Sequence, residues 1–119
     1  MRTGVFVNGG YVYKAETLIR LSEDLPIEQF NLLSVSLDDT EFIIWKLDNV
    51  RDIVVHYGRI KNSDLERPLI LRPDGVVMDG RHRIIKAISE GRKWLPARRL
   101  TADLITEAKK IEKGETHED

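Results

Sequence analysis

The segment Asp79-Gly80-Arg81-His82-Arg83 has the residue types and spacing to bind an anion. It stands where an apolar strand is expected to turn into a helix. The start of a helix leaves several backbone N–H groups without partners, and the helix dipole favours negative charge there. Gly80 lets another group approach the backbone closely. These features predict a phosphate-binding or nucleotide-binding corner.

The three basic residues after Gly80 strengthen this prediction. Exposed Arg81, His82 and Arg83 in the first turn would oppose the helix dipole, by roughly 0.3–1 kcal/mol each. A phosphate bound between them and the helix end would convert that repulsion into attraction. The alternative is that Asp79 caps the helix and the three cations form an ordinary solvated surface.

Each residue of the corner has a candidate role. Arg81 and Arg83 would neutralise phosphate charge. His82 would donate a hydrogen bond or act as an acid or base near neutral pH, which makes it a candidate catalytic residue. Asp79 is a candidate ligand for the phosphate site and for Mg²⁺, if it does not cap the helix.

A basic connector at residues 59–67 leads into this unit. Nine residues without strong periodicity before a central strand often carry function in a compact domain. Lys61 and Arg67 are therefore candidate phosphate ligands, and Glu66 is the candidate general base. The alternative is an ordinary solvated loop.

The corner needs a strand, a tight turn, a second strand and a helix to position it. Leu69–Leu71 is a short apolar run after a proline, which suits a buried strand. Residues 72–75 carry Pro and Asp-Gly turn chemistry, and residues 76–78 form the second strand. A helix is predicted over Arg81–Ser89, and Gly91 ends it.

The N-terminal third is predicted to begin with a hairpin, in which residues 5–7 and 11–13 flank an Asn-Gly-Gly turn. Residues 14–21 fit either a helical turn or two or a strand, and the two alternatives stay open. Residues 25–30 resemble the entry into a short helical turn. Residues 32–37 alternate partly and favour a strand.

A clearer helix follows, with Asp48 as its cap and Gly58 as its stop. Its apolar residues fall at helical spacing: Leu47, Val50, Ile53, Val54 and Tyr57. Tyr57 and Trp45 are interpreted as core residues rather than as residues that stack on a ligand. His56 lies in the last turn, where a cation is favoured, and is interpreted as structural.

The C-terminal part is predicted to return as a strand and then a helix. Residues 93–100 form the strand, and Pro96 suggests that it is an edge strand or an irregular one. Gly114 ends the last helix. The domain is thus expected to span residues 1–114, and residues 115–119 are expected to form a disordered acidic tail.

The composition fits a single cytoplasmic domain. A chain of 119 residues is large enough for one core but not for two. The absence of cysteine excludes disulfides, a cysteine nucleophile and thiolate metal sites. No apolar run reaches the roughly 18–20 residues that cross a membrane, and no signal-peptide pattern opens the sequence, so no membrane partner is expected.

The net charge of −1 is unevenly distributed. Residues 59–99 contain eleven Lys or Arg and five Asp or Glu, a net charge of +6, so the remainder carries −7. This gathering of positive charge around the corner favours an anionic ligand there over a surface that coats nucleic acid generally. The alternative is a set of solvated charged faces.

Residues 68–71, residues 76–78 and the DGRHR corner together resemble the ParB/sulfiredoxin superfamily, in particular its small single-domain ParB-like proteins. The likeness covers about residues 45–100. It implies an α+β fold in which helices pack on a small mixed sheet around the strand–turn–helix corner.

In this superfamily the corner binds the phosphates of a nucleotide, which is ATP in sulfiredoxin, CTP in ParB and ADP in a related free-serine kinase. The resemblance therefore implies one of these nucleotides with Mg²⁺. By position, Gly80, His82 and Arg83 match the phosphate-binding turn. Arg67 and Pro68 fall where relatives place the loop and strand beside the nucleotide.

Arg81 departs from the family pattern. It stands where sulfiredoxin has its reactive cysteine, which excludes the sulfinic-acid repair reaction, and where ParB has the glutamate linked to hydrolysis. Three hypotheses stay open. The first is a nucleotide-binding domain with weak hydrolysis or phosphotransfer, the second is a DNA-binding or ParB-like nuclease protein, and the third is a non-catalytic regulatory or interaction protein.

Overall fold

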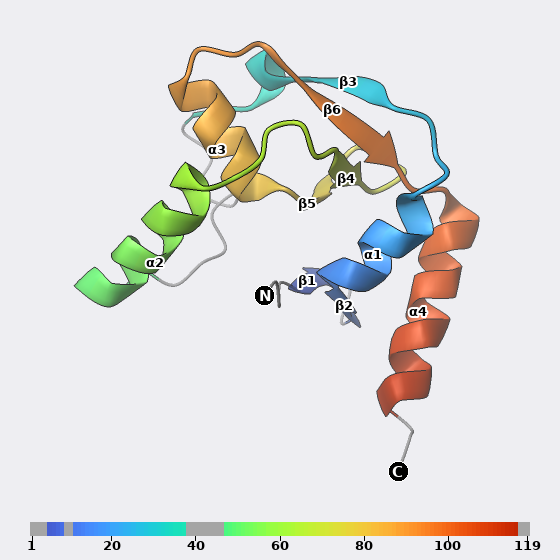
Figure 1. The fold of residues 1–119 in the computed structure, drawn as a ribbon. Coiled ribbons are helices and arrows are strands. Elements are labelled where there is room, and N and C mark those ends of the chain that lie inside the picture. The colour runs from blue at the N-terminus through green and yellow to red at the C-terminus, as the bar shows by residue number, and fades with distance from the viewer. Residues whose placement is uncertain (1–4, 9–10, 38–46, 117–119) are drawn as a thin grey trace.

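Four short strands pair into a mixed sheet in the order β3-β6-β4-β5 (Figure 1). Their bounds are Glu28–Asn31 for β3, Trp94–Arg99 for β6, Leu69–Leu71 for β4 and Val77–Asp79 for β5. The β3–β6 and β4–β5 pairs are antiparallel, and the β4–β6 pair is parallel. The computed structural model describes residues 5–8, 11–37 and 47–116.

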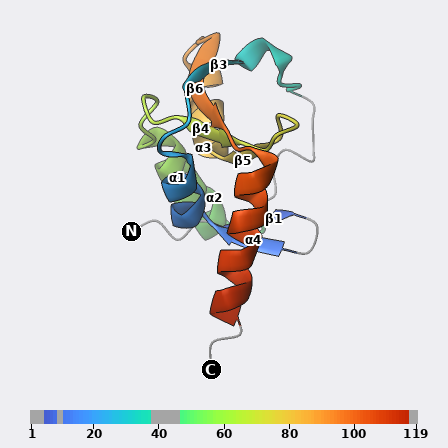
Figure 2. The same ribbon diagram turned by 90° about the vertical axis from the view of Figure 1, so that its right-hand side faces the viewer.

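Helices cover both faces of this sheet because β4 is apolar on both sides. Leu69 and Leu71 pack in the cluster that contains residues of α3 (Arg81–Ser89). Ile70 packs in the opposite cluster with α1 (Ala15–Ser22) and α4 (Ala102–Thr116), as expected for alternating strand side chains. Figure 2 shows α1 and α4 in front and α3 behind. The described residues thus form a small α+β domain, as predicted.

The N-terminal hairpin is confirmed, with β1 (Val5–Asn8) antiparallel to β2 (Tyr11–Lys14). α1 begins directly after β2, so the segment that fitted either a helix or a strand is a helix. Tyr13 is fully buried in the cluster shared by α1 and α4. The backbone N–H of Lys14 donates to Oε2 of Glu112 at 3.1 Å, which ties the hairpin to α4.

Helix α2 spans Val50–Lys61 and begins one residue later than predicted. Its N-cap is Asn49 and not Asp48. The Asn49 side chain accepts a hydrogen bond from the N–H of Asp52 at 2.9 Å, and the Asp52 carboxylate accepts one from the N–H of Asp48 at 3.1 Å. The first bond satisfies a donor that the helix start leaves open, and the second holds the residue before the N-cap.

The end and the apolar face of α2 also differ from the prediction. Gly58 does not stop the helix, which continues to Lys61 with Asn62 as C-cap. Tyr57 is 63% exposed and is therefore not a core residue. Trp45 lies outside the described residues.

Two predictions between α1 and α2 are wrong. Residues 25–30 were expected to enter a helical turn, but residues from 28 onward form β3, whose partner β6 lies more than 60 residues later. Residues 32–37 were expected to form a strand but begin with a 3₁₀ helix, η1 (Leu32–Ser34). The Asn31 side chain accepts a hydrogen bond from the N–H of Leu33 at 2.9 Å, and this local bond favours the turn over an extended chain.

β6 is an interior strand, so Pro96 does not mark a sheet edge. β6 pairs with β3 over residues 94–97 but with β4 only over residues 97–99. Pro96 is therefore paired only with Gln29 of β3. The pairing with β4 begins at Ala97, so the N–H that proline lacks is not needed there.

Helix α4 does not end at Gly114 but continues to Thr116. The first two residues of the predicted tail therefore belong to the helix. Residues 117–119 lie outside the described residues.

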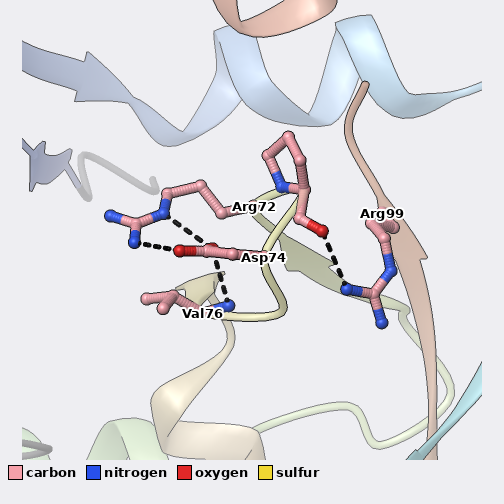
Figure 3. Close-up of polar contacts among 5 residues, drawn as sticks. Arg72, Asp74, Val76 and Arg99 are labelled. Carbon is pink, nitrogen blue, oxygen red and sulfur yellow. Dashed lines mark hydrogen bonds and ion pairs between the residues drawn. The ribbon is translucent and has the colours of Figure 1, made fainter. Parts of the chain in front are cut away.

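The predicted turn between β4 and β5 is confirmed, and its own side chains hold it (Figure 3). The N–H of Arg72 donates to the carbonyl of Val76 at 2.8 Å. The Asp74 carboxylate accepts hydrogen bonds from Nε of Arg72 at 2.9 Å and from the N–H of Val76 at 3.3 Å. Arg99, on β6, donates to the carbonyl of Pro73 at 3.2 Å, so the turn is anchored to the strand beside β4.

The Asp74 carboxyl is expected to titrate well below its ordinary range. Its hydrogen bond with Arg72 lowers the pKa of Asp74 from 3.8 to about 2. Because the folded pKa lies below the unfolded one, the ion pair stabilises the turn above about pH 4 and is lost as the pH falls toward 2. An NMR titration of the carboxyl carbon measures this midpoint. Arg72→Met should raise the midpoint toward 3.8, because Arg72 is the largest cause of the shift, although the N–H of Val76 still donates to the carboxylate. An unchanged midpoint would show that the pair does not form in solution.

Candidate functional site

Gly80 connects the end of β5 to the start of α3 and is the N-cap of that helix, with φ +118°. Only glycine adopts this conformation readily. A Cβ placed on Gly80 would lie 2.4 Å from Cδ2 of Leu69, which is fully buried in β4. Tight contact between the corner and β4 therefore requires glycine here, independently of any ligand.

Arg83 and Asp79 form a buried ion pair behind the corner. Nη2 of Arg83 donates to Oδ2 of Asp79 at 2.7 Å, and both side chains are 5% exposed. Nη1 of Arg83 donates to the backbone carbonyls of Arg67 and Pro68 at 2.8 and 2.7 Å. Arg83 thus connects β5 and α3 to the chain that enters β4.

The Asp79 side chain bonds the Arg83 guanidinium and is not the N-cap of α3. The N-cap of α3 is Gly80, so the interpretation of Asp79 as the helix cap is wrong. Its carboxylate is buried against Arg83 instead. The position of Arg83 in the sequence suggested a ligand-facing cation, but its four-residue separation from Asp79 also matches an i, i+4 pair.

Arg81 occupies a partly buried position at the first residue of α3. Burial lowers the pKa of Arg81, and the nearby charge of Asp79 opposes that effect. The guanidinium remains charged at neutral pH because arginine does not deprotonate in proteins. Arg81 therefore places a positive charge at the corner. Because burial removes part of the water around this charge, an anionic partner there would be favourable.

His82 lies against His56 of α2, which the sequence did not link to the corner. Nε2 of His82 and Nδ1 of His56 are 3.0 Å apart, and the rings are stacked with centroids 5.2 Å apart and an interplanar angle of 16°. One of the two nitrogens must donate and the other accept, so at least one ring is neutral. Burial, followed by the charge of Arg59, lowers the pKa of His56, while Asp52 opposes the shift.

No local signal in the sequence could have paired these histidines, because they are 26 residues apart on different helices. Lys86 helps to bring the helices together. Its Nζ donates to the carbonyls of Lys61 and Ser63 at 2.9 and 2.7 Å, which fastens the C-terminal end of α2 to α3.

The three candidate site residues on the connector, residues 59–67, are exposed to solvent: Lys61, Glu66 and Arg67. Lys61 and Arg67 contribute backbone carbonyls to Lys86 and Arg83, and the N–H of Glu66 donates to Oδ1 of Asp64 at 3.0 Å. The structure therefore joins Arg67 to the corner through its backbone and joins His82 to His56.

The start of α3 is chemically suited to an anion rather than to a cation. Its N-cap offers no side-chain acceptor, and its first turn contains no acidic residue. Within the described residues, no group of three or more His, Asp or Glu side chains is placed to hold a metal ion. Because the Asp79 carboxylate already bonds Arg83, it does not fit the role of a Mg²⁺ ligand.

Comparison with protein-family models, with curated proteins and with solved structures gives no match. The resemblance to the ParB/sulfiredoxin superfamily therefore remains a prediction from the residues. Among the helices that the structure describes, none combines the length and the apolar character needed to span a bilayer.

Proposed function

We propose that the corner formed by Gly80, Arg81 and His82 binds a phosphate group, as part of a nucleotide such as ATP, ADP or CTP. The observation that carries the proposal is the start of α3. It has neither a side-chain cap nor an acidic residue, and a partly buried arginine stands at its first position. The family resemblance supports the same site.

The proposed division of roles follows from the contacts of each residue. Arg81 supplies the positive charge for the phosphate, because it is partly buried at the first position of α3, whereas Arg83 is buried and bonds Asp79. Gly80 keeps the backbone close, and the helix dipole adds a modest attraction. Arg83 acts as a positioning residue that holds the corner against β4.

His82 is proposed to act through the ring nitrogen that does not face His56. Because Nε2 faces His56, a hydrogen bond from His82 to a phosphate oxygen would come from Nδ1. This is a binding role. The geometry gives no specific support to proton transfer by His82 or Glu66, since Glu66 is an exposed residue of the connector.

A thermal-shift assay tests the proposal on the full chain. ATP, ADP, CTP and inorganic phosphate are added separately, each with and without Mg²⁺. A ligand present at about 100 times its Kd stabilises the folded state by about 2.7 kcal/mol, which is a readily measured rise in Tm. We expect at least one nucleotide to raise Tm in the millimolar range.

Arg81→Gln should remove the ligand-induced rise in Tm, and Arg92→Gln is its matched control. Arg92 also lies within the positively charged residues 59–99, but it is an exposed residue beyond the C-terminal end of α3. The control removes the same charge and should keep the rise. Loss in both variants would indicate a general charge effect, and no rise with any of the ligands would overturn the proposal.

A further inference from the structure

The contact between His56 and His82 joins the middle of α2 to the start of α3. The facing nitrogens are 3.0 Å apart and the ring centroids 5.2 Å apart, so the nitrogens lie close to the line between the two ring centres. This is the alignment of an N–H···N hydrogen bond. His56 therefore belongs to the surroundings of the corner, although it lies on another helix.

A second polar contact keeps α2 beside α3. Nζ of Lys86 donates to the carbonyls of Lys61 and Ser63 at the C-terminal end of α2. The two residues of α3 that make these contacts, His82 and Lys86, are four apart and therefore lie on one face of the helix. Since no residue of α2 is buried, the two polar contacts help to fix where this helix, and with it His56, lies.

The hydrogen bond restricts two choices that a histidine ring otherwise has. The ring can turn over, because its χ2 torsion is broad and roughly two-fold. A neutral imidazole can also carry its proton on either nitrogen. If His56 donates to Nε2 of His82, a neutral His82 carries its proton on Nδ1. If Nε2 of His82 donates instead, Nδ1 of a neutral His82 carries none.

The charges around the pair favour two neutral rings. Burial, followed by the charge of Arg59, lowers the pKa of His56, while Asp52 opposes the shift. His56 is therefore neutral at neutral pH and has a single N–H. Arg81 precedes His82 at the start of α3, and both its charge and the helix dipole disfavour a further positive charge there.

We propose that His56 is a positioning residue for the corner: its Nδ1–H donates to Nε2 of His82 and so keeps the proton of His82 on Nδ1. The inference rests on the proposed phosphate site, because only this one of the two neutral arrangements gives His82 a donor for a phosphate oxygen. The other arrangement sets a lone pair against that oxygen. His56 acts through His82 and does not contact the ligand.

Long-range ¹⁵N–¹H NMR of the ligand-free full chain shows which nitrogen of His82 carries the proton, at about pH 8, where imidazole is neutral. The chain has three histidines, so His117→Gln and the His56 variants assign the signals. We expect the Nδ1–H form of His82 in the wild type. His56→Leu should leave both forms populated. His56→Asn should keep the Nδ1–H form, because its amide nitrogen is bonded to Cγ, as Nδ1 of histidine is.

The same variants are then titrated with inorganic phosphate, and the backbone amide shifts of residues 80–82 give the Kd. His56→Leu should raise the Kd at least about threefold, which corresponds to the loss of one hydrogen bond. His56→Asn should stay within about twofold of the wild type. If α2 acted only by packing, the two variants would raise the Kd equally, and this result would overturn the proposal.

The tautomer measurement separates this inference from the proposed function. A His82 proton on Nε2, or an Nδ1–H form that persists in His56→Leu, would overturn the role of His56 whether or not phosphate binds. If the wild type bound no phosphate but lost its Nδ1–H form in His56→Leu, the proposed function would fall. The positioning of His82 by His56 would stand.

Discussion

Replacing Arg83 with methionine is expected to lower the free energy of unfolding by about 3–5 kcal/mol. The change leaves the Asp79 carboxylate buried without its cation. It also removes the donor that the carbonyls of Arg67 and Pro68 share. Urea denaturation followed by circular dichroism measures the loss.

Two variants separate this effect from a general loss of charge. Arg92→Met removes an exposed arginine and should stay within about 0.5 kcal/mol of the wild type. The double variant Asp79→Leu with Arg83→Met removes both buried charges and should recover part of the stability. If Arg83→Met cost no more than an exposed ion pair, about 1 kcal/mol or less, the buried pair would not exist in solution.

This prediction also decides which residue can test phosphate binding. An Arg83 variant that loses ligand binding would be uninformative, because partial unfolding would produce the same result. Arg81 is the suitable probe, because it is only partly buried, whereas Arg83 is buried and connects Asp79 to the chain that enters β4.

The second large effect is expected at the corner itself. Gly80→Ala should lower the free energy of unfolding by about 2–5 kcal/mol, again measured by urea denaturation. The new Cβ would lie 2.4 Å from Cδ2 of Leu69 and 3.3 Å from Cζ of Arg83. The positive φ of +118° adds backbone strain to this overlap.

Gly91→Ala is the matched control for Gly80→Ala. Gly91 also has a positive φ, +78°, but nothing lies within 4 Å of a Cβ placed there. Its variant should show the backbone penalty alone, about 1–2 kcal/mol. The difference between the two variants therefore reports mainly the overlap of the new Cβ with Leu69 and Arg83. Equal losses would contradict close packing of the corner against β4.

The contacts divide the DGRHR segment into two groups. Asp79, Gly80 and Arg83 have structural roles that explain their presence without any ligand. Arg81 and His82 are left as the residues whose positions favour an anion. Fewer residues are therefore proposed to contact the phosphate than the sequence predicted: the side chains of Arg81 and His82, together with the start of α3.

The sequence by itself determined the elements whose signals are local. The pairing of β1 with β2, the strand Leu69–Leu71, the turn between β4 and β5 and the helix Arg81–Ser89 were all predicted correctly. Each depends on turn residues and short-range periodicity, which act between neighbours in the chain. The corner could therefore be located before the structure was known.

Only the tertiary structure decided which residues the corner brings together and which faces are buried. β3 became a strand because β6 offers it hydrogen-bonding partners, and β6 lies inside the sheet although it contains Pro96. The helical spacing of α2 correctly predicted an apolar face but not that this face points to solvent. The ion pair of Arg83 with Asp79 and the contact of His56 with His82 arise when β5, α2 and α3 pack, because periodicity orders side chains around one element but does not specify what lies opposite them.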